Sequence, residues 1–304
     1  MRHASSPFLL LVVCSFLLAA KIMIAQVAIS TGLKPFQLAI LGNVGAAMVL
    51  LIFARATGQA ILWERQHMTL YLVLGIISFA VPTVVTYMVV DPVGPAYVSS
   101  LYALSPVLTM TLAAIFGLEG LTARRTFGIT LGFVGMVALI QQKIAGINFS
   151  AVFWVLLGLT VPLAAASGNI IRTAFWPSGA SPLSFATATL LISSVLLALV
   201  GPLIESPATW SISGEGQVFW LVVLIGVSAL SYLLNYTFQK IAGPVMFSQI
   251  GYWGTGFGVI LAAMLFGDVL QATSLIGVVA IIAGGLLANR TATKDTNSIK
   301  VPSR

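Results

Sequence analysis

An internal repeat constrains the fold of this chain more than any other feature of its sequence. Residues 94–138 return 149 positions later, without a gap, as residues 243–287. The residues that recur in register include Gly94 with Gly243, Pro95 with Pro244, Ser99 with Ser248, Glu119 with Asp268, Gly128 with Gly277 and Gly135 with Gly284. Such matches in one register carry more weight than matches between Leu and Ala, which any two apolar segments would show. We therefore infer an internal duplication, with a first repeat over residues 1–145, a second over 146–290 and a C-terminal tail over 291–304.

The composition places both repeats in a membrane. Hydrophobic residues make up 59% of the 304 residues and charged residues only 7%, with a mean hydropathy of +1.06, so the chain cannot cover a water-soluble surface. At about 20 apolar residues per span, this length predicts an all-α integral membrane protein with ten transmembrane helices. The expected spans are residues 7–30, 36–54, 70–90, 95–117, 125–141, 152–173, 182–203, 217–239, 244–266 and 270–289. A signal peptide over residues 1–20 is the alternative for the first span, although the apolar run continues to Ile29.

Basic residues orient the spans, because they stay on the cytoplasmic side of a membrane. With the N-terminus inside, eleven Lys and Arg residues fall on the inner side and only Lys34 and Lys143 on the outer side. This asymmetry predicts cytoplasmic N- and C-termini in the inner or plasma membrane. Five spans separate equivalent positions of the two copies, so the second copy enters the membrane from the opposite side. The expected architecture is two inverted five-helix repeats, which suits alternating access, although a duplication can also merely enlarge a bundle.

Residues 103–140 add a family resemblance. They combine Ser105-Pro106 in one span, Glu119 with Leu121-Thr122 in an acidic turn, and Gly128, Gly132 and Gly135 in the next span. In this order of motifs the chain resembles the EamA-like repeats of the drug/metabolite transporter superfamily. The resemblance implies two five-span repeats and a secondary transporter of small organic metabolites. Similar proteins handle amino acids, vitamins, nucleotide sugars and toxic organic compounds, so the resemblance does not specify a substrate.

Lys21 is the most informative side chain. It lies between the apolar runs 8–20 and 22–29, about ten residues or roughly 15 Å from the outer end of its span. An ammonium group at this depth costs at least about 2.5–3.5 kcal/mol to insert, so it should face a wet cavity or a partner. Since no Asp or Glu is expected at mid-span, an acidic group of the substrate, such as that of an amino acid derivative, is the best available counter-charge. Three alternatives remain: the long stem reaches the outer interface, the ammonium group binds backbone carbonyls, or Lys21 exchanges protons during coupling.

Four spans carry polar side chains at helical spacing, which a lipid-facing helix would not retain. They are the repeat-equivalent third, fourth, eighth and ninth spans, so we expect a shared central cavity. The candidate substrate contacts on them are Tyr87, Tyr102, Ser105, Tyr232, Asn235 and Tyr252. Helix packing is the alternative, although Tyr and Asn are large for close packing.

Other residues of the spans are expected to act on structure or gating. Pro106, Glu119, Gly251 and Asp268 belong to this group, since proline bends a helix and the two acids mark the ends of the fourth and ninth spans. Asn43 and Asn169 are more typical of packing hydrogen bonds than of ligand contacts. Arg172, near the inner end of its span, suits a cytoplasmic anchor as well as a substrate contact.

The scarce residue types narrow the function further. His3 and His67 lie outside the spans and Cys14 is the single cysteine, so no metal site, catalytic dyad or intrachain disulfide is predicted. No GxxxxGK[ST] motif occurs, and no cofactor is expected. The expected partners are a small-molecule substrate and the lipid bilayer, with no nucleic acid and with a homodimer left open. Secondary transport rather than catalysis is the predicted function; a membrane enzyme, or a lipid-handling or receptor-like bundle, is the alternative.

Overall fold

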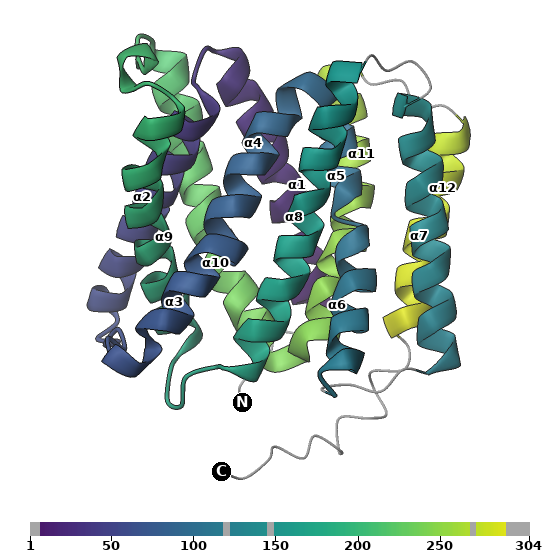
Figure 1. Ribbon diagram of the computed structural model, residues 1–304, viewed down its shortest axis with the longest axis horizontal. Helices are drawn as coiled ribbons and strands as arrows, with labels where there is room; N and C mark the ends of the chain where they lie inside the picture. Colours follow the sequence, from purple (N-terminus) through teal and green to yellow (C-terminus); the bar gives the residue numbers. More distant parts are fainter. Residues whose placement is uncertain (1–6, 118–121, 145–148, 268–271, 290–304) are drawn as a thin grey trace.

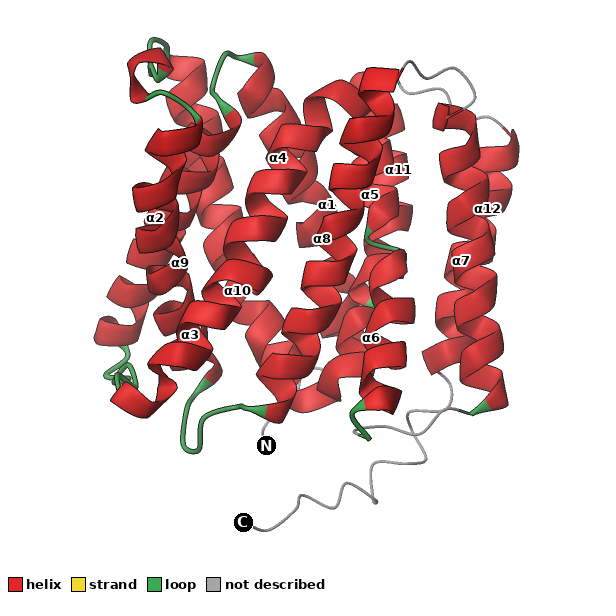
Figure 2. Ribbon diagram, viewed as in Figure 1, coloured by secondary structure: helices red, strands yellow, loops and turns green. Residues whose placement is uncertain are grey.

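The computed structural model describes residues 7–117, 122–144, 149–267 and 272–289, and every regular element in these ranges is a helix (Figures 1 and 2). The first half forms α1 (Pro7–Ser30), α2 (Pro35–Ala56), the 3-10 turn η1 (Arg65–His67), α3 (Met68–Leu74), the π-helical turn η2 (Gly75–Ala80), α4 (Val81–Val93), α5 (Pro95–Leu101), α6 (Leu104–Ile115) and α7 (Ala123–Ile144). The second half forms α8 (Phe149–Ala174), α9 (Pro182–Ile204), η3 (Pro207–Thr209), α10 (Glu215–Ser248), α11 (Ile250–Phe266) and α12 (Ala272–Asn289). The helices stand side by side in one bundle, and α1 begins at the same end of it at which α12 ends (Figure 1).

The bundle is apolar on the outside and carries polar side chains inside. The large side chains of Leu203 and Met264 are 84% and 76% exposed, whereas Asn43, Thr109 and Thr255 are buried. Seven helices of the described ranges are long and apolar enough to cross a membrane, and α11, with 17 residues, is a shorter apolar helix. Apolar surface of this extent is unstable in water and suits lipid. The all-helical prediction is confirmed, and the protein is embedded in the membrane through several spans.

Two glycines break the helices at equivalent places in the two halves. Gly94, between α4 and α5, has a φ of 88°, and Gly243, inside α10, has a φ of 75°. Glycine adopts such angles without the steric cost that a Cβ would add, and the proline that follows each glycine resumes the helix. The long helix α10 therefore covers the eighth expected span and also the beginning of the ninth.

The fourth and ninth expected spans are each divided into two shorter helices. Pro106 has no N–H to donate to the Tyr102 carbonyl, which instead accepts from the Ser105 N–H at 3.0 Å, so the bend predicted at Pro106 falls between α5 and α6. The division between α10 and α11 has no proline. There the Gln249 N–H reaches only three residues back, to the Met246 carbonyl at 3.2 Å. The equivalent division in the second half was therefore not apparent from helix-breaking residues.

Helices α7 and α12 pack closely along one edge of the bundle (Figure 1). A Cβ built on Gly135 of α7 would collide with the Gly277 carbonyl of α12, and one built on Gly284 of α12 would collide with the Gly128 carbonyl of α7. The sequence repeat pairs Gly135 with Gly284 and Gly128 with Gly277, so each contact is the counterpart of the other. Glycine at these positions lets the two backbones approach, as in other membrane helix pairs.

We expect Gly135→Ala to lower the thermal stability of the purified protein, because the added methyl group must push α7 and α12 apart. Overpacking of this kind costs about 1–3 kcal/mol. Gly226→Ala is the matched control, since a Cβ on Gly226 of α10 meets no atom within 4 Å. Thermal unfolding in detergent, followed by tryptophan fluorescence, compares the two variants. Equal midpoints for both variants and the parent protein would contradict the close approach of the two backbones.

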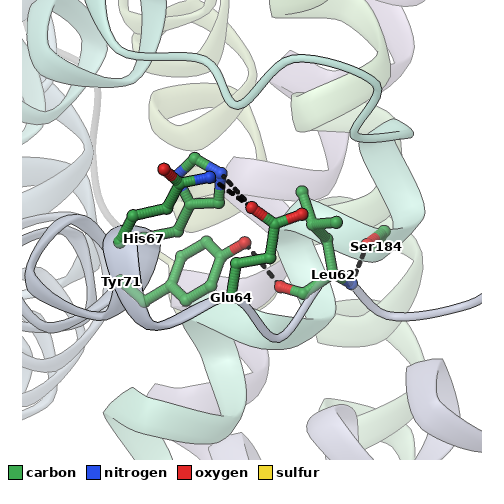
Figure 3. A network of polar contacts seen from close by, with 6 residues as sticks. Leu62, Glu64, His67, Tyr71 and Ser184 are labelled. Atoms are coloured by element: carbon green, nitrogen blue, oxygen red, sulfur yellow. Dashed lines mark hydrogen bonds and ion pairs between the residues drawn. The ribbon is translucent and has the colours of Figure 1, made fainter.

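A network of polar contacts ties the connection between α2 and α3 to the start of α9 (Figure 3). The Leu62 N–H donates to Ser184 Oγ at 2.9 Å, and the Tyr71 hydroxyl donates to the Leu62 carbonyl at 2.8 Å. His67 Nε2 lies 3.5 Å from a carboxylate oxygen of Glu64 in the same connection. These contacts fix the position of α3, and through η2 that of α4, relative to α9.

Candidate functional site

A cavity of about 140 Å³ lies inside the bundle, between α1, α4, α8 and α10. The π-helical turn η2, the α5–α6 break and the start of α11 complete its wall. Six of the seven side chains predicted to contact substrate line this cavity: Lys21, Tyr87, Tyr102, Ser105, Tyr232 and Asn235. Both halves of the chain contribute, so residues far apart in the sequence meet at one place.

Lys21 reaches the cavity from the middle of α1. Its Nζ lies 4.1 Å from the centroid of the Tyr232 ring of α10, a cation–π contact. The Tyr232 hydroxyl donates to Asn43 Oδ1 of α2 at 3.2 Å, which holds the ring in place. No carboxylate of the described residues lies within ion-pair distance of Lys21. The aromatic face attracts the ammonium group but cannot neutralise its charge.

Several hydroxyl groups lie on the side of the cavity formed by α4 and the α5–α6 break. The Tyr102 hydroxyl is 3.1 Å from Thr86 Oγ1, and Tyr87 follows Thr86 in α4. Ser105 lies in the first turn of α6, beside the carbonyl that Pro106 leaves without its usual partner. Hydroxyls both donate and accept, so this side of the cavity can bind carboxylate oxygens as well as N–H groups.

Several polar atoms of the cavity wall have no protein partner in the described part of the chain. Among them are Asn235 Oδ1, Arg172 Nε and Ser78 Oγ. Asn235 Nδ2 makes only a long contact, 3.5 Å, to Ser231 Oγ. An unpaired buried polar group costs about 1–3 kcal/mol, so most such groups in proteins are hydrogen-bonded. The wall therefore favours a ligand or ordered water that supplies partners.

Arg172 enters the cavity from α8 as a second cation. It is 6% exposed, and its Nη2 donates to Asn169 Oδ1 at 3.0 Å. Asn169 Nδ2 in turn lies 3.3 Å from Thr109 Oγ1 of α6. A buried guanidinium does not reach the lipid headgroups, so the alternative of a cytoplasmic anchor loses its basis. Asn169 and Arg172 are three residues apart and share one helix face, which is a signal that the sequence already contained.

Two aromatic residues of the wall, Tyr236 and Phe79, were not among the predicted contacts. The Arg172 Cζ lies 4.4 Å from the centroid of Tyr236, and the Phe79 ring lies 4.8 Å from that of Tyr232 and 6.0 Å from that of Tyr236. Tyr236 is the repeat partner of Tyr87, so the repeat could have identified it. Phe79 lies in η2, where a π-helical turn changes which side chains face inward. The spacing of apolar residues at 3.6 per turn, which reveals the inward face of an α-helix, does not reveal this shift.

Tyr252 lies outside the cavity. Its side chain is fully buried between α11 and α7, where a Cβ on Gly132 would collide with its ring, and its hydroxyl is 3.5 Å from the Ile129 carbonyl. This placement corrects the expectation that Tyr252 shares the cavity, because its face of α11 meets another helix. The preceding residue, Gly251, lines the cavity and lies against the Tyr102 carbonyl. The other two predicted gating residues, Glu119 and Asp268, lie outside the described residues.

The cavity wall combines cations with neutral hydrogen-bonding groups. Two cations, several hydroxyls and two amides line it, and none of its lining residues in the described ranges is acidic. Those ranges also contain no group of three or more His, Cys, Asp or Glu side chains that could hold a metal ion. Charge-assisted hydrogen bonds to Lys and Arg in an apolar wall bind carboxylates and phosphates strongly.

Comparison with known proteins agrees with this architecture. Residues 5–141 match the model of the EamA-like transporter family, as the motifs of residues 103–140 predicted. No curated protein matches the chain. A solved structure described as "Crystal structure of protein" is similar over 95% of this chain and 98% of its own length, with a TM-score of 0.74 and 16% sequence identity. At this identity the similarity shows the fold alone, and it extends over both halves of the chain.

Proposed function

We propose that this chain, whose residues 5–141 match the model of the EamA-like transporter family, is a secondary transporter that moves a small acidic metabolite by alternating access. The substrate binds in the cavity between α1, α4, α8 and α10. The observation that carries this proposal is the presence of two cations, Lys21 and Arg172, in a cavity to which the described residues contribute no carboxylate. An acidic group of the substrate, such as the carboxylate of an amino acid derivative, is the simplest counter-charge for a cation inside a membrane.

The duplicated architecture supports alternating access. Together with the seven long helices, α7, α11 and α12 make ten spans, which we assign to two inverted repeats over residues 1–145 and 146–290. The glycine breaks at Gly94 and Gly243 and the reciprocal contacts between α7 and α12 support this assignment. Both termini are cytoplasmic in this arrangement, in an inner or plasma membrane. Inverted repeats can exchange conformations, and that exchange opens the site to alternate sides.

One contact between the halves is not matched by its repeat-equivalent contact. Thr255 Oγ1 of α11 donates to the Ser99 carbonyl of α5 at 2.7 Å. At the equivalent position, Pro106 replaces Thr255 and has no hydroxyl to donate to Ser248. In the proposed orientation the α5–α11 contact lies toward the outside. The described conformation is therefore held more firmly on its outer side and corresponds to an inward-facing or occluded state.

Counterflow into proteoliposomes tests the proposed function. Vesicles are loaded with one unlabelled acid from a panel of lactate, N-acetylalanine and glutarate, and a trace of the same labelled acid is added outside. A transporter exchanges the two and accumulates label transiently, whereas protein-free vesicles do not. We expect such a transient for at least one acid and none for lactamide or N-acetylalaninamide, which keep the size and lose the charge.

The other outcomes separate the competing functions. Counterflow of neutral or cationic compounds alone would show a transporter whose substrate is not acidic. If no compound exchanged although some of them raised the thermal stability of the protein, a binding or catalytic membrane bundle would be favoured over a transporter. A membrane enzyme would also require an acid, a base and a nucleophile that converge on one ligand.

A further inference from the structure

We propose that the substrate of this cavity is dianionic, with one acidic group bound by Lys21 and the second by Arg172. The inference rests on the proposed function, which requires one acidic group only, and it adds a second group together with its position. Two observations support this inference: Lys21 and Arg172 lie at different levels of the cavity, and the described residues provide no acidic partner for either of them.

The two cations occupy different levels of one aromatic wall. Lys21 Nζ lies 4.1 Å from the Tyr232 ring, and the Arg172 Cζ lies 4.4 Å from the Tyr236 ring. Tyr232 and Tyr236 are four residues apart on α10, which is about 6 Å along the helix axis. Phe79 of η2 contacts both rings. A single carboxylate held tightly by one cation therefore leaves the other cation at a separate level of the same cavity.

Arg172, like Lys21, has only neutral partners in the described part of the chain. These include the Asn169 amide oxygen and the rings of Tyr236 and Phe247, at 4.4 and 5.2 Å. Its Nε has no hydrogen-bond partner among the described residues. Neutral dipoles lower the free-energy cost of burying a guanidinium group but do not neutralise its charge. The planar fork of N–H groups on the guanidinium fits the oxygens of a carboxylate or phosphate. The free edge of Arg172 thus fits an acidic group of the ligand.

The two cations come from repeat-equivalent helices. Helix α8 is the repeat-equivalent of α1, and with the offset of 149 residues Arg172 corresponds to Met23 rather than to Lys21, so the two cations share the helix but not the position. Each half of the protein thus contributes one cation from the same helix of its repeat. A ligand with an acidic group at each end matches this arrangement, whereas a ligand with one acidic group leaves one of the two halves without its ionic contact.

The test uses the purified full-length protein and ligands that differ in one charge. Succinate, glutarate and adipate vary the distance between two carboxylates, and the half-amide of each keeps the length while removing one charge. Dissociation constants are measured by calorimetry for the parent protein and for Arg172→Met and Arg172→Lys. We expect at least one diacid to bind about 10- to 100-fold more tightly than its half-amide, the factor typical of a hydrogen bond to a charged group.

The variants assign the second acidic group to a residue. In Arg172→Met the diacid and its half-amide should bind equally, whereas Arg172→Lys, which keeps the charge, should retain part of the preference. Full retention of the preference in Arg172→Met would overturn the proposal. The ligand series on the parent protein decides the matter even where a buried substitution prevents folding.

The failure of this inference can be distinguished from failure of the proposed function. If each diacid and its half-amide bind the parent protein equally, and both bind more tightly than the diamide, the dianionic substrate is excluded while the acidic substrate stands. If the diamides bind as well as the acids, both proposals fail.

Discussion

Lys21→Met is expected to reduce transport strongly at sub-saturating substrate concentrations, whereas Lys21→Arg should retain most of it. Methionine keeps the length and apolar character of the lysine stem and removes the charge, so the acidic group of the substrate loses its contact at mid-membrane. Hydrogen bonds to charged groups contribute about 1.5–3 kcal/mol, which corresponds to a loss of about 10- to 100-fold in apparent affinity. Initial rates of counterflow at several substrate concentrations measure the effect. Lys34→Met is the matched control, since Lys34 is exposed at the start of α2.

The pair of Lys21 variants also separates binding from proton coupling. Arginine keeps a positive charge but does not release its proton near neutral pH. Loss of transport in both variants, together with loss of proton-driven accumulation, would assign Lys21 to coupling. Unchanged transport in both would indicate that Lys21 does not bind the substrate and that its stem reaches the interface. Among the described residues of the cavity, Arg172 would then be the one remaining cation in support of an acidic substrate.

Single cysteines at Tyr97 and Ser248 are expected to change their accessibility in opposite senses when substrate is added. Tyr97 lies near the start of α5, which is the outer end in the proposed orientation, and Ser248 lies at the end of α10; both are 2% exposed in this structure. If the repeats exchange conformations, opening at one of these places accompanies closing at the other. The parent for Tyr97→Cys and Ser248→Cys carries Cys14→Ala, which removes the buried native thiol. Labelling by a thiol reagent is followed with and without an acid that shows counterflow.

Thr255→Val adds a directional check to this experiment. It removes the hydroxyl that donates to the Ser99 carbonyl and keeps the shape of the side chain. A hydrogen bond contributes about 1 kcal/mol, so outward opening, and with it labelling of Tyr97→Cys, should rise roughly five-fold. Parallel changes at Tyr97→Cys and Ser248→Cys would instead indicate a channel or a static bundle.

The all-helical membrane fold could be predicted from the amino-acid sequence alone. Apolar composition requires backbone hydrogen bonds to be satisfied within the membrane, and helices satisfy them locally, so the all-helical fold needed no knowledge of tertiary contacts. The first span, residues 7–30, coincides with α1. Lys21 could be recognised because a charge inside an apolar run is costly wherever the run lies. The repeat paired Tyr87 with Tyr236, and both line the cavity.

The tertiary structure decided which polar faces meet the cavity. A stripe on a helix shows that residues share a face, but it does not show what that face meets. The stripe of α11 with Tyr252 and Thr255 meets α7 and α5. In contrast, Asn169, expected to pack, and Arg172, for which an anchor and a substrate contact were equally suited, both line the cavity. Phe79 was placed by a π-helical turn that no side-chain pattern marks. Periodicity along a chain is local, and the partner of each helix face is set by packing among helices distant in sequence. The sequence by itself therefore determined the all-helical class and the charge inside an apolar run, while only the fold assembled the polar side chains into a site.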